Sequence, residues 1–393
     1  MKTTKLGFAV AAALVAISAA GCGDDEAGDD DDDVGQVDAG DDIDAPAGAC
    51  QLTAWTAPDF TTNAADALAL RAQLDMLTGT TMRGAEQETV IVDEVSDLEA
   101  IYDGGSPALS ASVPAGFDAI IDGAFAGFVA VALAGPQDLV DDGGNWTPGD
   151  DGGIFGARQA GINTGGLELR QIVDKGLFGG GGLYAYALGL TEGNITADTI
   201  DALAAAWGTD AALDPEARTD SANYAYRMGF HGGIAQALTA AKAYTADDAC
   251  TAERDEALET FFEQWELALI ARTVYYANAS ATAMAAATTD DERADALHEL
   301  AEGLGLALGF YGLPDPSAGP MAGVGRVITD ADVEAMMTAL GVDIDDFGAS
   351  TTGAFVSDSA GFQTGVTALE TRVKQVYQLD DADIASYRTP TDG

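Results

Sequence analysis

The chain has 393 residues, and its 65 acidic side chains against 17 basic ones give a net charge of −48 at pH 7. Nucleic-acid binding needs basic patches, so this charge excludes a nucleic-acid partner and opposes attraction to anionic lipid. The hydrophobic content of 47% allows a proper core, and the length suits one large domain or two smaller ones. The acidity is compatible with attracting cations, but adaptation to salt or simple solubility is the interpretation we favour.

The N-terminus has the pattern of an export signal. Lys2 and Lys5 precede an apolar segment, Leu6–Ile17, which is too short to span a bilayer. Small residues then lead to Cys22, and this junction resembles a bacterial lipobox. In that family of signals the cysteine becomes the lipidated first residue of the mature protein. We therefore predict a signal peptide at residues 1–21 and a lipid anchor on Cys22, with an ordinary secretory signal as the alternative.

Residues 22–50 are predicted to form a disordered acidic tether. Asp24–Asp44 is rich in Asp and Gly and contains no aromatic residue, so it cannot bury enough apolar surface to offset its conformational entropy. Its Asp run lacks the ligand spacing of an EF-hand calcium loop. We expect this tether to hold a folded body, residues 51–393, away from a membrane of the bacterial cell envelope, at the outer membrane or the cell surface.

Two further cysteines lie at the end of the tether and within the body. If Cys22 carries lipid, Cys50 and Cys250 remain in an exported and oxidising compartment, which favours a disulfide between them. Such a bond would tie the start of the body to the loop around Asp248. Two free or intermolecular thiols are the alternative.

The first half of the body is predicted to be helical because apolar residues recur at spacings of three and four. Ala64–Leu77 places its leucines, Leu68, Leu70, Leu74 and Leu77, near one face. Phe117–Ala134 is almost wholly apolar, and its acids together with the signal context favour a buried helix over a membrane span. The Gly/Asp-rich loop 141–153 follows and marks a candidate boundary between two lobes.

Four consecutive glycines occur within Lys175–Leu190. A phosphate loop needs glycines at set offsets between a strand and a helix, and no clear strand precedes this run. We therefore predict a helix break, or a bare helix face against which another helix backbone packs closely.

The second half of the body is also predicted to be helical. Thr196 is a candidate N-cap, Gly208 a candidate helix end, and Thr329 with Asp332 resembles a capping box. We expect Ala252–Ala287 and Asp290–Phe310 to be antiparallel neighbours, because the second follows the first closely. The predicted helices are Ala197–Trp207, Asp220–Tyr244 with an interruption at Gly232 and Gly233, Ala252–Ala287, Asp290–Phe310, Val333–Leu340 and Ser359–Tyr377.

The two histidines offer one candidate metal site. His298 and Glu302 lie four residues apart, so on a helix they share a face and could share a metal ion. A solvent-facing His–Glu pair is the interpretation we favour. His231 lies among glycines and has no carboxylate three or four residues on, so we expect a packed histidine or one at a helix end.

An acidic helix face offers Glu259, Glu263 and Glu266 at spacings of four and three. Carboxylates so arranged on facing helices can build a metal site within a bundle. Solvated charges on an amphipathic helix are the default interpretation. No Ser-His-Asp arrangement can be recovered, and we predict no catalytic residue.

Four stretches of the body together carry a family resemblance. They are LALRAQLDML (Leu68–Leu77), IVDKGLFGG (Ile172–Gly180), FFEQWELALIARTVYYAN (Phe261–Asn278) and ALHELAEGLGLALGFY (Ala296–Tyr311). In this order they resemble an uncharacterised family of helical bacterial lipoproteins that is loosely similar to the imelysin proteins. The resemblance spans most of residues 60–350. It implies a two-lobed, all-helical fold at a bacterial surface or in the periplasm, a link to iron uptake and a peptidase label.

One imelysin motif is incomplete in this chain. The metal-like motif of that family is Gly-x-His-x-x-Glu, and Gly229 and His231 match it. Ile234 stands where the glutamate is expected, which argues against metal binding or peptidase activity through this motif. His298 does not restore it, because Ala301 occupies the corresponding position.

We therefore predict an all-α, lipid-anchored protein that binds an unidentified ligand or protein partner without catalysis. The resemblance implies iron or metal acquisition, with a metal ion at His298 and Glu302 as the candidate cofactor. A metal-dependent hydrolase is one alternative, and a carboxylate-rich site with an open metal position would favour it. A surface interaction or scaffolding protein is the other, and a large exposed apolar patch would favour that.

Overall fold

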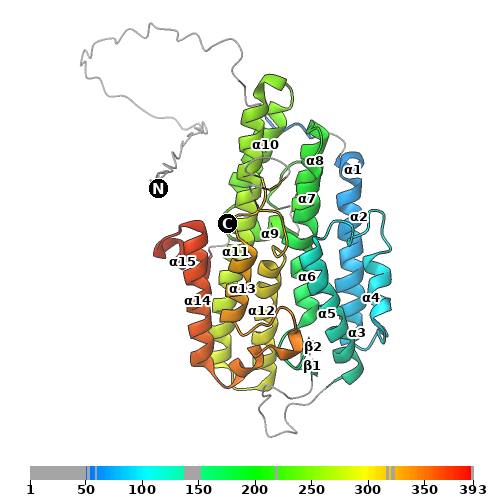
Figure 1. The fold of residues 1–393 in the computed structure, drawn as a ribbon, viewed down its shortest axis with the longest axis vertical. Helices are drawn as coiled ribbons and strands as arrows, with labels where there is room; N and C mark the ends of the chain where they lie inside the picture. Colours follow the sequence, from blue (N-terminus) through cyan, green and yellow to red (C-terminus); the bar gives the residue numbers. More distant parts are fainter. Residues whose placement is uncertain are drawn as a thin grey trace, which may run out of the picture. The chain divides into compact units, whose positions relative to one another are not determined.

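The computed structural model describes residues 50, 54–57, 60–136, 152–216, 220–315, 318–319 and 324–390. Within these residues the fold is all-α, as the sequence predicts, apart from one two-stranded sheet (Figure 1). Gly48–Gly393 forms one compact unit. The predicted signal peptide, Cys22 and the tether before Cys50 lie outside the described residues, as does most of the candidate boundary at 141–153.

The elements fall into two sets along the chain. Those up to residue 207 are α1 (Phe60–Asn63), α2 (Ala65–Leu74), the π-helix η1 (Asp75–Met82), α3 (Arg83–Glu86), α4 (Val95–Tyr102), α5 (Ala115–Ala134), β1 (Gly153–Phe155), β2 (Ala160–Ile162), α6 (Leu169–Phe178), the π-helix η2 (Gly180–Tyr184), α7 (Ala185–Leu190) and α8 (Ala197–Trp207). Those after it are α9 (Asp220–Arg227), α10 (His231–Tyr244), the 3₁₀ turn η3 (Asp248–Cys250), α11 (Thr251–Ala286), α12 (Asp290–Leu308), α13 (Asp330–Ala339), the 3₁₀ turns η4 (Phe347–Ala349) and η5 (Thr352–Val356), α14 (Ser359–Tyr377) and α15 (Asp381–Arg388).

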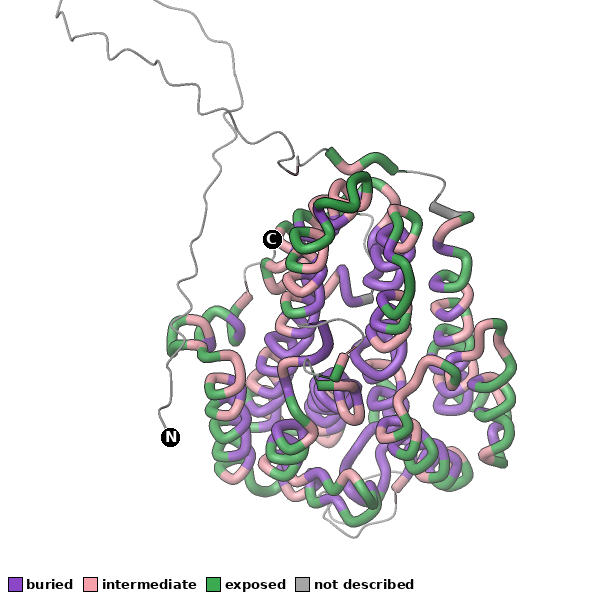
Figure 2. The backbone as a smooth tube through the Cα atoms, turned by 45° about the horizontal axis from the view of Figure 1, so that its top comes forward, coloured by how far each residue is buried: buried purple, intermediate pink, exposed green. Residues whose placement is uncertain are grey.

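Helix α11 lies at the centre of the packing. It is 36 residues long and packs against α10, α12 and α14, while α12 packs in turn against α6 (Figure 1). Thr273 donates a hydrogen bond to Gly303 O at 3.1 Å, and Ser280 donates one to Ala296 O at 2.5 Å. Because the later residue of α11 meets the earlier residue of α12, the two helices are antiparallel, as predicted. Buried residues line the inward faces of the helices, and exposed residues cover the outer ones (Figure 2).

The predicted helix ends agree with the structure at two sites. The Thr196 side chain accepts a hydrogen bond from Thr199 N at the start of α8, and Gly208 ends that helix with φ of 109°. The Thr329–Asp332 capping box at the start of α13 is present. The interruption between α9 and α10 lies at Gly229, where φ is 81°, and not at the two glycines that follow His231.

The four-glycine run packs closely against another backbone, as predicted. A Cβ atom on Gly180 would lie 2.6 Å from the carbonyl carbon of Gly309, at the end of α12. One on Gly305 of α12 would lie 2.7 Å from Gln171 O of α6. Glycine at these positions therefore allows the α6–η2 segment and α12 to approach more closely than side chains would permit. The predicted helix break is also present, because α6 ends at Phe178 and η2 follows.

The face of α2 and η1 was predicted correctly except at one leucine. Leu70, Leu74 and Leu77 are buried, but Leu68 is 41% exposed, so its assignment to the same face is wrong. Leu68 precedes Leu70 by two residues, which is about 200° around a helix.

Helix α5 is long and apolar enough to cross a membrane, and it is the one such helix among the described residues. One of its faces is buried in the core, through residues such as Phe117, Ile121 and Phe125. The length and apolar composition of α5 do not distinguish a membrane span from a core helix, because the core helix of a soluble protein can have both.

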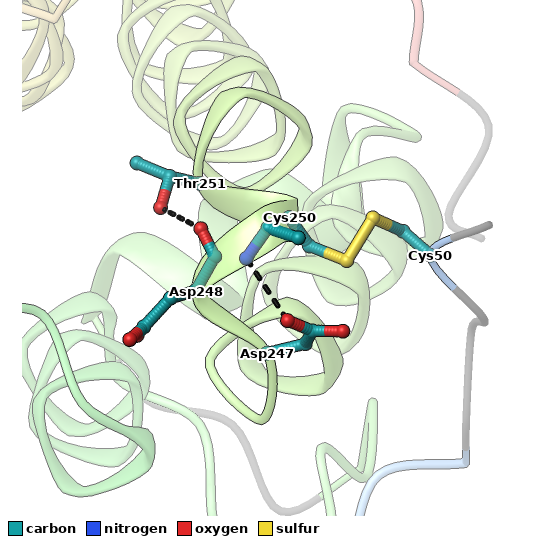
Figure 3. The surroundings of a disulfide bond; sticks show 6 residues. Cys50, Asp247, Asp248, Cys250 and Thr251 are labelled. Carbon is teal, nitrogen blue, oxygen red and sulfur yellow. Dashed lines mark hydrogen bonds between the residues drawn. A yellow bond between two sulfur atoms is a disulfide. The ribbon is translucent and has the colours of Figure 1, made fainter. Parts of the chain in front are cut away.

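Cys50 and Cys250 form a disulfide, with their Cα atoms 5.7 Å apart (Figure 3). Cys250 ends the short turn η3, where its N–H donates a hydrogen bond to Asp247 O at 2.9 Å. Thr251 then donates to Asp248 O at 2.8 Å as α11 begins. The predicted pairing is therefore confirmed, and it fastens the first residue of the described body to the start of the central helix.

Candidate functional site

Charged side chains gather where α12 packs against α6. We call the following set the buried ion network: Glu86, Glu168, Arg170, Asp174, Lys175, His298 and Glu302. Glu86 is the last residue of α3, Glu168 is the N-cap of α6, and the next three network residues belong to α6 itself. The last two are on α12. The glycines that let α6 and α12 approach closely also bring these charges together.

Glu168 orients His298. Glu168 is fully buried, and its Oε2 lies 2.6 Å from His298 Nδ1 while its Oε1 accepts Arg170 Nη2 at 2.8 Å. Burial opposes ionisation of Glu168, but its hydrogen bond with His298 and the charges of His298 and Arg170 hold its pKa below the ordinary value. An ionised carboxylate only accepts hydrogen bonds, so Nδ1 of His298 carries the shared proton. Nε2 is the ring nitrogen that is left for other interactions.

Glu86 connects the network to its neighbouring elements. Its carboxylate accepts Arg170 Nε at 2.7 Å, Arg83 Nη1 at 3.0 Å and Gly161 N of β2 at 3.2 Å. Burial raises the pKa of Glu86 to about 7, the charge of Glu168 acts in the same direction, and the charge of Arg170 opposes both. These bonds hold α3, β2 and α6 together around one carboxyl group.

Lys175 forms the other end of the network. Its Nζ lies 3.0 Å from Asp174 Oδ2 and 3.4 Å from Glu302 Oε1. Burial alone would lower the pKa of Lys175, but the charges of Asp174 and Glu302 hold it well above its usual value. Burial raises the pKa of Asp174, but the charge of Lys175 and a 2.6 Å hydrogen bond from Thr78 lower it. The pKa of Asp174 is therefore below its ordinary value. Both groups are therefore charged at neutral pH.

A pocket of about 350 Å³ opens onto this end of the network. Its walls include Thr78, Arg170, Asp174 and Lys175, and Tyr224 of α9. Larger pockets among the described residues include one of about 720 Å³ along small residues of α5, one of about 500 Å³ beside Tyr311 and Glu334, and one of about 420 Å³ around Trp55. The pocket beside the buried ion network brings together Arg170, Asp174 and Lys175, which other residues hold in place, and convergent charges of this kind are typical of a recognition site. The pocket around Trp55 also has charged walls, including Arg254 and Lys242, which pairs with Asp201 at 2.6 Å.

The structure places His298 and Glu302 together but not at the surface. His298 is only 6% exposed, so the solvent-facing interpretation is wrong for it. Its Nε2 lies 3.9 Å from Glu302 Oε1, which is too long for a hydrogen bond, and Lys175 shares that carboxylate. Among the described residues no group of three or more His, Cys, Asp or Glu side chains is arranged to hold a metal. A metal at this pair stays a prediction.

The remaining candidate residues are His231 and the glutamates on the acidic face of α11. His231 starts α10 and is buried, with its ring 5.0 Å from that of Trp207, so the packed, helix-end prediction is confirmed. On the acidic face of α11, Glu263 is exposed and Glu259 is partly exposed. Glu266 is fully buried, so the default of solvated charge is wrong for it.

Comparison of the chain with protein-family models, with curated proteins and with solved structures finds no significant match. The resemblance to imelysin-like lipoproteins therefore stays a prediction, and the site must be interpreted from its own geometry.

Sequence reasoning did not identify most of the network. The signal for it was present in the segment that forms α6, where Arg170, Asp174 and Lys175 interrupt an otherwise apolar pattern. Charges within a helix that is buried nearly all round must find partners, because an isolated buried charge is costly. Which partners they find depends on α3 and α12, which are distant in sequence.

Proposed function

We propose that this chain is a lipid-anchored protein of the bacterial cell envelope whose helical body binds a small polar ligand without catalysing a reaction. The observation that supports it most is the pocket beside the buried ion network, where Arg170, Asp174 and Lys175 are held by one another and by their neighbours. Side chains fixed before binding lose little entropy on binding, which favours recognition. Their mutual ion pairs suit steady binding better than proton transfer.

The envelope location rests on the N-terminal pattern and the disulfide. Cys22 follows a charged and then apolar segment that is typical of lipoprotein signals. The Cys50–Cys250 disulfide is typical of an exported protein. The proposed partner is thus the membrane, through the anchor, together with a ligand in the pocket.

The anchor is tested by labelling cells that express the full chain with a radioactive fatty acid. We expect label and membrane association in the wild type and in a C50S/C250S double variant, and loss of both in Cys22→Ser. A Cys22→Ser protein that still fractionates with membranes and keeps the label would refute lipidation at this cysteine.

The pocket is tested on the soluble body, residues 48–393, which forms one compact unit. A panel of small anionic, cationic and neutral polar metabolites is screened for an increase in Tm. We expect at least one hit that Lys175→Met abolishes and that Lys374→Met preserves. Lys374 is a suitable control because it is a surface lysine on α14 that pairs with the exposed Asp381. Hits that both variants retain would place the ligand elsewhere, and a panel without hits would favour the scaffolding alternative.

The second candidate function is metal binding. It would serve either iron or metal acquisition or a metal-dependent hydrolase. One observation favours it: Glu168 holds Nδ1 of His298, which leaves Nε2 beside Glu302. A carboxylate that orients the non-ligating nitrogen is common around metal-bound histidines. Elemental analysis and calorimetric titration of iron, zinc and calcium test it on the same soluble body. Stoichiometric binding that is lost in an H298A/E302Q double variant would support a metal site, and calcium binding unaffected by the double variant would refute it.

A further inference from the structure

One buried arginine has no acidic partner among the residues that the structure describes. The described residues include three buried arginines, Arg170, Arg272 and Arg326. Arg170 pairs with two network carboxylates, and Arg326 pairs with Asp330 at 2.5 Å. Arg272, on α11, is 7% exposed, its Nε has no hydrogen-bond acceptor, and it forms no ion pair with any described residue.

Three aromatic rings surround this guanidinium instead. Its central carbon lies 4.0 Å from the ring centroid of Tyr275, 4.4 Å from that of Tyr276 and 5.3 Å from that of Tyr224. We call these three residues the tyrosine cage. Ring faces attract a cation, but they do not accept the hydrogen bonds of its N–H groups. The cage therefore stabilises the charge of Arg272 and leaves its donors unused.

The tyrosine cage shares a wall with the pocket beside the buried ion network. Tyr224 lines that pocket together with Lys175 and Asn223. The ring of Tyr224 also lies 5.9 Å from Lys175 Nζ, so two cations contact one tyrosine. A ligand in the pocket thus contacts Tyr224, and Arg272 lies against the same ring, whereas Arg272, Tyr275 and Tyr276 do not themselves line the pocket.

The hydroxyl groups of Tyr224 and Tyr276 add a hydrogen-bond donor to the tyrosine cage. Tyr224 Oη and Tyr276 Oη are 3.3 Å apart, so one hydroxyl donates to the other and the second hydroxyl is free to donate elsewhere. Burial raises the pKa of Tyr276, with the charge of Glu302 acting in the same direction, so its hydroxyl keeps its proton at neutral pH. Glu302 itself is engaged by Lys175.

We propose that Arg272 and the tyrosine cage bind the oxyanion group, a carboxylate or a phosphate, of a ligand that extends from this pocket past Tyr224. The inference rests on the binding function proposed above and names the chemical class of that ligand. A guanidinium presents paired N–H donors that match the two oxygens of such a group, and the free tyrosine hydroxyl supplies a further donor. A bound oxyanion would also provide the counter-charge that Arg272 lacks.

Calorimetric titration of the soluble body with inorganic phosphate, acetate and succinate, at constant ionic strength, tests this inference. We expect binding of at least one of these anions, and the three titrations distinguish a phosphate from a carboxylate ligand. Arg272→Met should weaken that binding by roughly tenfold or more, because a charge-assisted contact is lost. Arg254→Met is the matched control on the same helix, since Arg254 already pairs with Asp255, and it should bind like the wild type.

Tyr224→Phe provides a variant that keeps the ring and removes one hydroxyl, and its fold is checked by circular dichroism. We expect it to weaken anion binding by a few-fold, so the inference does not depend on Arg272→Met folding well. Absence of binding by any of the three anions, or equal affinities in the wild type and both variants, would overturn the oxyanion assignment. A cationic or neutral hit from the metabolite panel would then still support the proposed binding function. Failure of the oxyanion assignment can therefore be distinguished from failure of the binding function.

Discussion

Glu266 shows how one carboxylate can join separate parts of the chain. It is fully buried on α11, where its oxygens accept hydrogen bonds from Val327 N at 2.7 Å and Ile328 N at 2.8 Å. Tyr377, the last residue of α14, donates a third hydrogen bond at 2.5 Å. Burial outweighs these bonds and raises the pKa of Glu266 to about 7. The segment that enters α13 and the end of α14 are therefore held to α11 by a group that titrates near neutrality.

This raised pKa predicts a pH dependence of stability. The folded state binds the Glu266 proton more tightly than the unfolded chain, whose value is near 4.5. The stabilisation from protonation is therefore complete below about pH 4.5 and is lost as the pH rises through about 7. We expect Glu266→Gln to make the free energy of unfolding depend less on pH in this range, measured by urea denaturation at several pH values. Glu256→Gln, which removes an exposed acid from the same helix, is the control, and parallel pH profiles for the two variants would contradict the prediction.

Removing Glu168 should destabilise the fold far more than removing a surface acid. Glu168→Ala leaves Arg170 and His298 buried without their shared anion, which typically costs about 3–5 kcal/mol. Asp295→Ala on α12 breaks an exposed pair with Arg158 and should cost less than about 1 kcal/mol. Denaturant unfolding compares the two, and similar losses would show that the network contributes no more than a surface ion pair.

At the scale of elements, glycine decides how closely α6, η2 and α12 approach. Gly180→Ala would place a methyl group 2.6 Å from the backbone of Gly309, so we expect a loss of about 1–3 kcal/mol or more in the free energy of unfolding. Gly123 is the matched control, because it lies inside α5 and a Cβ there meets nothing within 4 Å. Gly123→Ala should stabilise the helix by about 0.5–1 kcal/mol. Thermal or urea unfolding gives both values, and a neutral Gly180→Ala would mean that the contact relaxes easily.

Element positions were predictable where local signals were strong. Periodic apolar residues and capping pairs such as Thr329 and Asp332 located most of the long helices. The antiparallel hairpin of β1 and β2 was not predicted, because strands of three residues are too short to show an alternating pattern. The π-helix at Asp75–Met82 was also missed, since no sequence period distinguishes it from an α-helix over so few residues.

At the scale of the whole molecule, one covalent link closes most of the body into a loop. Cys50 and Cys250 are 200 positions apart in sequence. The C50S/C250S double variant should lose about 2–5 kcal/mol in the free energy of unfolding, the range typical for removal of a native disulfide. Urea denaturation of the double variant and of the wild type under reducing conditions should agree. Equal stability of the oxidised and reduced wild type would show that the bond does not stabilise the fold.

The candidate site was only partly predictable. The i,i+4 spacing of His298 and Glu302 identified two of its residues, because helical spacing is a local property. It did not reveal that His298 is buried and Glu302 half-buried, or that Glu168 and Lys175 engage them. Those contacts join α12 to residues more than a hundred positions earlier in the chain.

By itself the sequence determined the all-α class, the main helix boundaries, the pairing of Cys50 with Cys250 and the packed environment of His231. Each follows from short-range chemistry: periodicity, caps, the number of thiols or the immediate neighbours. Only the tertiary structure decided that Glu266 is buried, that the charges of α6 meet those of α12, and that Arg272 lies among three tyrosines and pairs with no acid in the described part of the chain. The physical reason is that partners for a buried charge come from whichever helices pack against it, and helix periodicity alone does not specify that packing.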